Sequence, residues 1–105
     1  MEEIIEEISD KIFLEKLKNE FKESVKGYIE ELKRYEADEK YQEMRKIAHD
    51  IKGIAGVFGF NRGTELASDF LTFTDSGDQI KTKEIYSLLI SYLEKDVLEI
   101  NAEEK

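Results

Sequence analysis

The residues best suited to chemistry lie in one short segment around His49, the single histidine of this 105-residue chain. Lys52 follows it at i+3 and Gly53 at i+4, so both are its neighbours if the segment is helical. A neutral imidazole is a competent nucleophile toward phosphorus. The phosphoryl group that it accepts brings about two negative charges, which a nearby lysine offsets by charge-assisted hydrogen bonds. This spacing therefore indicates phosphoryl acceptance at His49, with stabilisation by Lys52.

The charge distribution sets this segment apart from the rest of the chain. The net charge is −9, yet residues 45–62 hold four cations and only Asp50 as an anion. One of the four, Arg45, lies one turn before His49, where it could supply a second cation to a phosphoryl group. An acidic chain lacks the basic face that nucleic acid requires, so we expect no nucleic-acid partner.

A helical wheel places the functional candidates away from the core. With about 100° per residue, one arc is apolar and predicted to be buried. It consists of Met44, Ile47, Ile51, Ile54, Ala55 and Phe58. His49, Lys52, Gly53 and Gly56 fall roughly opposite. We therefore expect an exposed imidazole.

The two glycines on this exposed arc are costly for a helix. Each destabilises a helix interior by about 1 kcal/mol relative to alanine. Glycines that allow close packing of helices would belong on the core arc, which Gly53 and Gly56 do not occupy. We therefore predict that they leave room for a macromolecular partner to reach the imidazole, Gly53 most directly.

The remaining sequence predicts an all-α fold, an antiparallel up-down four-helix bundle with a short N-terminal helix or turn. Ile4, Ile5 and Ile8 indicate the N-terminal turn, packed on the bundle, and Ser9 or Asp10 caps the first long helix. The apolar stripe of that helix is Phe13, Leu17, Phe21, Val25, Tyr28, Leu32 and Tyr35. Breaks follow near residues 37–38 and 59–61, with Asn61 as N-cap of a third, shorter helix. Residues 76–78 form a turn, and the last helix begins near Thr82 and reaches Ile100.

Composition restricts the possible functions further. A chain of this length forms one domain, residues 1–105. It contains no cysteine, which excludes disulfides and thiolate metal sites and fits a reducing compartment. No stretch resembles a signal peptide or a membrane span, so we expect a cytoplasmic protein with no membrane partner. No nucleotide-binding loop or metal-ligand set is present, which predicts no cofactor, no metal and no autonomous kinase activity.

The run Ala48-His49-Asp50-Ile51-Lys52-Gly53, continuing to Phe60, resembles the signature of histidine-containing phosphotransfer (HPt) domains. It is also similar to the phosphorylatable domain of chemotaxis histidine kinases. Gly59, ten positions after the histidine, matches the family pattern as well. The resemblance implies that His49 is the phosphoacceptor through Nε2, that Lys52 steadies the phosphoryl group and that Gly53 admits a receiver domain. Val57 and Ile54 would contribute to partner specificity.

Two positions depart from the family pattern. Relatives often carry Gln or Glu 22 residues after the histidine, in contact with the imidazole, but this position is Leu71, with Ser68, Asp69 and Thr72 as the nearest polar residues. This leaves open what orients the ring. Gly63 replaces a usually apolar residue, which suggests that the third helix starts late.

The resemblance implies a carrier that relays phosphoryl groups between receiver-domain aspartates, with receiver domains or a hybrid histidine kinase as partners. Two alternatives remain open at this point. One is a helical adaptor that transfers nothing, and the other is the phosphoacceptor domain of a larger chemotaxis-type kinase. The absence of a polar residue at Leu71 counts against the kinase-embedded domain, and the initial Met and acidic ends favour an independent protein.

Overall fold

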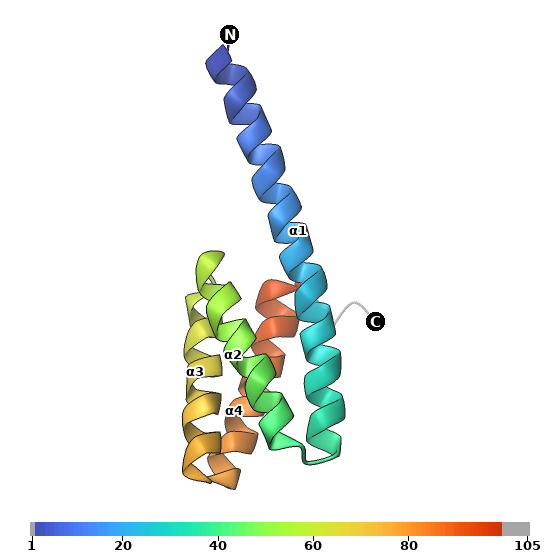
Figure 1. The fold of residues 1–105 in the computed structure, drawn as a ribbon, viewed down its shortest axis with the longest axis vertical. Coiled ribbons are helices and arrows are strands. Elements are labelled where there is room, and N and C mark those ends of the chain that lie inside the picture. Colours follow the sequence, from blue (N-terminus) through green and yellow to red (C-terminus); the bar gives the residue numbers. More distant parts are fainter. Residues whose placement is uncertain (1, 100–105) are drawn as a thin grey trace.

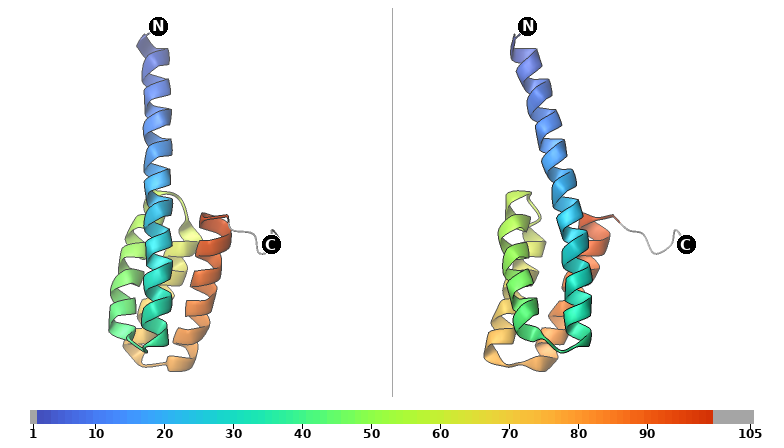
Figure 2. Two further views of the ribbon diagram at one scale, coloured as in Figure 1. Left: turned by 90° about the vertical axis from the view of Figure 1, so that its right-hand side faces the viewer. Right: turned by 45° about the vertical axis from the view of Figure 1, so that its right-hand side comes forward.

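The protein is a bundle of four helices (Figure 1). The computed structural model describes the backbone of residues 2–99 and the side chains of residues 10–99. The helices are α1 (Glu2–Ala37), α2 (Tyr41–Val57), α3 (Asn61–Ser76) and α4 (Gln79–Tyr92), and α4 continues into a π-helical turn, η1 (Leu93–Val97). Short connections make successive helices antiparallel neighbours (Figure 2), so the predicted up-down bundle is confirmed.

The apolar stripes of the helices meet in one core. From α1 the buried side chains are Phe21, Val25, Ile29 and Leu32. Three of these belong to the seven-residue predicted stripe, and Ile29 was not predicted. The other helices contribute the remaining buried residues, which are Met44, Ile47, Ala48, Ile51, Ala55, Leu66, Ala67, Phe70, Leu71, Leu89, Ile90, Leu93 and Val97. Tyr28 and Tyr35 are half-buried against this core. Residues at helical spacing are thereby removed from water, which is the main stabilising contribution in a bundle of this kind.

The N-terminal region differs from the sequence prediction. Instead of a separate short turn packed on the bundle, α1 is one continuous helix from Glu2, and its first turns extend beyond the other helices (Figures 1 and 2). The predicted cap at Ser9 or Asp10 is therefore wrong, because both residues lie inside the helix. Phe13 was expected in the core but is 60% exposed. The physical reason is that no other helix reaches this far along α1.

The turns between helices use backbone of positive φ to stop each helix. Glu39, Gly59 and Gly77 have φ values of 55°, 81° and 77°, in the left-handed region. At the end of α2, the Gly59 N–H donates to the Gly56 carbonyl at 3.2 Å and the Phe60 N–H donates to the Ala55 carbonyl at 2.9 Å. This pair of bonds is the Schellman motif, which explains a glycine at position 59.

The starts of α3 and α4 correct the predicted boundaries slightly. The N-cap of α3 is Phe60, one residue before the predicted Asn61, and α3 with 16 residues is shorter than α1 and α2, as predicted. The predicted turn at residues 76–78 is confirmed, since α3 ends at Ser76 and Asp78 caps α4 by accepting a hydrogen bond from the Lys81 N–H at 3.0 Å. Because of this cap, α4 begins at Gln79 and not near Thr82. The predicted last residue of the final helix, Ile100, lies outside the described residues.

Candidate functional site

Helix α2 has one buried face and one exposed face. Five of its side chains, Met44, Ile47, Ala48, Ile51 and Ala55, are fully buried. His49, Lys52 and Gly53 are exposed, on the face where the helical wheel placed them. Their spacing of three and four residues makes them neighbours on one turn. The imidazole is therefore open to solvent and to a second molecule, with an ammonium group beside it.

The two glycines of this face have different surroundings. A Cβ atom added at Gly53 would meet nothing within 4 Å outside the backbone of its own helix. At Gly56 an added Cβ would lie 3.4 Å from Oγ1 of Thr64 on α3. This is an ordinary van der Waals distance to a side-chain atom, so packing against α3 does not require a glycine at position 56. Neither position is closed to a Cβ atom by packing inside the molecule, and a role of Gly56 in partner contact stays a prediction.

Thr64 also connects α3 directly to the candidate site. Its hydroxyl donates a hydrogen bond to the main-chain carbonyl of Lys52 at 3.3 Å. The contact secures the backbone of α2 at the residue that carries the ammonium group. No sequence signal identified Thr64, because the pairing depends on how α3 lies against α2.

The cationic side chains of residues 45–62 differ in whether they already have a carboxylate partner. Arg45 forms two hydrogen bonds with Asp75 of α3, from Nε to Oδ1 at 2.6 Å and from Nη2 to Oδ2 at 2.9 Å. This hydrogen-bonded pair raises the pKa of Arg45 and lowers the pKa of Asp75. Arg62 pairs with Glu65 at 3.1 Å.

Lys52 makes no ion pair with any side chain among residues 10–99. Its ammonium group is thus available to a phosphoryl group on His49, whereas the guanidinium of Arg45 already has a carboxylate partner. That Arg45 supplies a second cation stays a prediction.

Leu71 of α3 occupies the position at which relatives often carry a polar contact to the imidazole. Leu71 is buried in the core. Thr72, one of the polar alternatives, donates its hydroxyl hydrogen to the carbonyl of Ser68 at 3.1 Å. None of the side-chain hydrogen bonds within residues 10–99 involves His49. Within this part of the chain, the tautomer of the ring is not set by a neighbouring side chain.

The C-terminal end of α2 carries an apolar surface next to the site. Val57 is 78% exposed, the most exposed of the large hydrophobic side chains described, whereas Ile54 is half-buried against the core. Val57 lies about two turns after His49 along α2. An exposed apolar residue at that distance is suited to contact with a protein partner that covers the site. Gly59 was also a candidate for partner binding. Its positive φ ends α2, and a contact of Gly59 with a partner stays a prediction.

Gly63 does not delay the start of α3, so that expectation is wrong. The helix begins at Asn61, and Gly63 is buried in its first turn. A Cβ atom at this position would lie 3.3 Å from Cε2 of Tyr92 and 3.4 Å from Cβ of Ala55. The ring of Tyr92 on α4 therefore fills the space beside the glycine.

Comparison with known proteins identifies the class that this bundle and its exposed histidine define. Residues 16–102 match the Hpt domain family, and this stretch includes all of α2, α3 and α4. The chain therefore belongs to the Hpt domain family, whose members transfer phosphoryl groups on histidine in two-component phosphorelays and are carriers, not kinases. No curated protein and no solved structure matches the chain. Within the described residues, none of the helices is long and apolar enough to span a membrane.

Proposed function

We propose that this protein relays a phosphoryl group between aspartates of receiver domains, with His49 as the intermediate carrier. The observation that carries the proposal is the face of α2 on which an exposed His49, a lysine without an ion pair and the open space at Gly53 lie together. Receiver domains of response regulators or of a hybrid histidine kinase are the partners, and the cytoplasm is the proposed location.

The transfer step follows from the chemistry of the two groups. The neutral imidazole attacks phosphorus with the lone pair of Nε2 while Nδ1 keeps its proton. The new N–P bond forms as the P–O bond to the partner's aspartate breaks, and the aspartate leaves as a carboxylate. Transfer to the next receiver reverses these events.

Each residue of the site has a separate part in this step. The Lys52 ammonium offsets the charge of the phosphoryl group while His49 holds it. The missing side chain at Gly53 lets the partner's aspartate approach in line, which requires the reacting atoms within about 3–3.5 Å. The exposed Val57 provides apolar contact with the receiver domain.

A phosphotransfer assay tests the proposal. The protein is mixed with a panel of receiver domains that carry labelled phosphoryl groups, and the label on this chain is measured over time. We expect rapid labelling of the wild type, none of His49→Gln, and slower labelling of Lys52→Ala. Labelling should be acid-labile and alkali-stable, as a phosphoramidate is.

Three results would contradict the relay function. Retention of label by His49→Gln would move the acceptor elsewhere, and labelling by ATP alone would show a kinase activity that a carrier lacks. A chain that binds receiver domains and never takes label would be an adaptor. His49→Gln must melt at the wild-type temperature, because an exposed residue contributes little packing.

A further inference from the structure

The N-terminal part of α1 has a second set of apolar positions in addition to those of the core stripe. The core stripe of this helix includes Val25, Phe21 and the half-buried Leu17, and Leu14, which is next in line toward the N-terminus, is 53% exposed. Ile5, Ile8 and Ile12 follow each other at spacings of three and four, which places these positions on one face of a continuous helix. With about 100° per residue, this face is roughly opposite to the core stripe. A helix that extends straight from the bundle cannot turn both faces toward the same core.

The second stripe is confined to the segment of α1 that has no neighbouring helix. Every side chain from Asp10 to Lys16 is exposed, and Ile12 is 62% exposed. Farther along the same face the residues are polar and charged, namely Glu15, Lys16, Asn19 and Glu23. The apolar positions of this face therefore lie within residues 5–12, in the first turns of α1.

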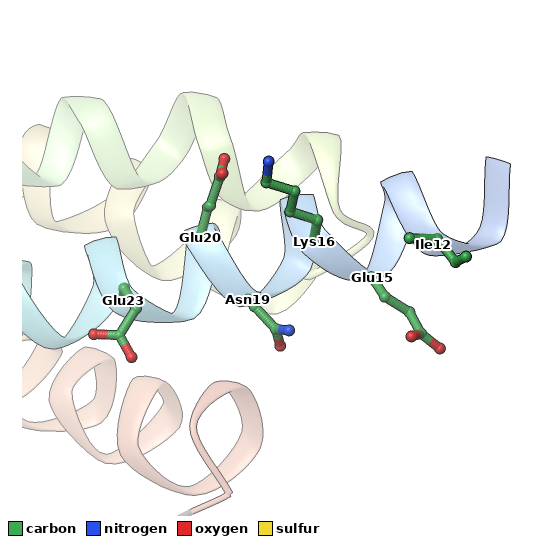
Figure 3. A pocket seen from close by; sticks show the side chains of 6 residues that line it. All are labelled: Ile12, Glu15, Lys16, Asn19, Glu20 and Glu23. Atoms are coloured by element: carbon green, nitrogen blue, oxygen red, sulfur yellow. The ribbon is translucent and has the colours of Figure 1, made fainter. Parts of the chain in front are cut away.

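This surface has the character of a helix contact and not of a small-molecule site. A shallow hollow near Ile12 is lined by six side chains that all come from α1 (Figure 3). Figure 3 shows these side chains projecting in several directions from one helix. A flat face with apolar residues at spacings of three and four is suited to another helix.

The distribution of charged residues along the first part of α1 favours a second copy of this chain as the partner, in an antiparallel orientation. Residues 2–10 contain five carboxylates and no cation, whereas residues 11–22 contain four lysines and two glutamates. Two copies aligned in parallel would place the acidic segments side by side. An antiparallel arrangement instead brings the acidic segment of each copy close to Lys11 and Lys16 of the other. Opposite charges beside an apolar seam favour that orientation.

We propose that two copies of this chain associate through antiparallel pairing of the N-terminal segments of α1. In this arrangement Ile5 of one copy lies opposite Ile12 of the other, and the two Ile8 positions meet near the symmetry axis. The partner helix then ends beside residue 15, before Leu17 and the start of the bundle. The contact is a closed, two-fold interface between identical surfaces.

Sedimentation velocity over a range of protein concentrations tests the association. We expect the wild type to shift from monomer to dimer as its concentration rises to about 1 mM, where even a weak dimer is populated. Ile12→Glu should remain monomeric throughout. Phe13→Glu is the matched control, because Phe13 is equally exposed on the same turn, at 60%, but lies about 100° away from the stripe. A wild type that stays monomeric, or equal loss of dimer in both variants, would overturn the proposal.

The orientation can be tested separately because the chain contains no cysteine. In an antiparallel pair, Glu2→Cys and Lys16→Cys should form a disulfide with each other when mixed, and neither should cross-link efficiently alone. Predominant Glu2→Cys homodimers would indicate a parallel pair and contradict the proposed arrangement. Ile12→Glu should accept phosphate at the wild-type rate, since His49 lies on α2, so this outcome is distinguishable from failure of the relay function.

Discussion

Gly53 on α2 and Gly63 on α3 are both helical glycines in one small bundle, and their surroundings are opposite. Gly63 is buried, with the ring of Tyr92 3.3 Å and Cβ of Ala55 3.4 Å from the place of a Cβ atom. Gly53 is exposed and has no such neighbour within 4 Å. Each glycine costs its helix about 1 kcal/mol relative to alanine. Close packing offsets this cost at Gly63, whereas nothing inside the molecule does so at Gly53. Gly27 shares that open space, so what connects Gly53 to the proposed partner access is its place one turn after His49 on the exposed face of α2.

The largest effect that would sharpen this comparison is expected for Gly53→Gln. The side chain would stand between the imidazole and an incoming receiver domain. We expect the transfer rate to fall by roughly 100-fold, because a small displacement of reacting groups is enough to slow a reaction by that factor. Stability should rise by about 0.5–1 kcal/mol because a helical glycine is removed. Transfer assays and chemical denaturation measure the two quantities.

Gly27 provides the control for this variant. It lies inside α1 and, like Gly53, has open space where a Cβ would be. Gly27→Gln should therefore show the same gain in stability with unchanged transfer. If Gly53→Gln accepted phosphate at the wild-type rate, the glycine would have no role in partner access.

A smaller effect, on stability alone, is expected for Gly63→Leu. A leucine side chain cannot fit between Tyr92 and Ala55 without displacing them, and overpacking of this kind typically costs about 1–3 kcal/mol. Denaturant unfolding should show the loss, while Gly27→Leu, made where space is open, should not be destabilised. Equal stability of the two variants would show that the packing around Gly63 adapts freely.

The smallest effect is expected from the exposed pair that joins α2 to α3 beside the site. Arg45 lowers the pKa of Asp75 in the folded protein, so the pair contributes stability above the unfolded pKa of Asp, about 3.9. That contribution is lost as pH falls through the lowered folded pKa, because protonation removes the carboxylate. The advantage of the wild type over Asp75→Asn in thermal melts should therefore be small at neutral pH and disappear in acid.

Asp69→Asn serves as the control for this comparison. Asp69 is exposed on the same helix and makes no ion pair within residues 10–99. The substitution removes no ion pair, so the melting temperature of this variant at neutral pH should be close to that of the wild type. A wild-type advantage over Asp75→Asn that persists in acid would show that the pair acts by something other than charge.

The sequence by itself determined the parts of this protein that depend on local periodicity. Helices form where apolar residues recur at spacings of three and four, so the core stripes of α1 and α2 and the exposure of His49, Lys52 and Gly53 were predictable. The motif around His49 indicated the family that residues 16–102 match. The turn at Gly77 was likewise predictable, since glycine tolerates the positive φ that ends a helix.

Only the tertiary structure decided which helices meet and where one lacks a neighbour. The hydroxyl of Thr64 on the Lys52 carbonyl, the pairing of Arg45 with Asp75, and the ring of Tyr92 beside Gly63 join residues of different helices. Such contacts depend on the rotation and register of one helix against another, which no single helix encodes. Phe13 continues the apolar pattern of α1 and is nevertheless exposed. Periodicity defines the apolar face of a helix, but whether another helix covers that face depends on the tertiary structure.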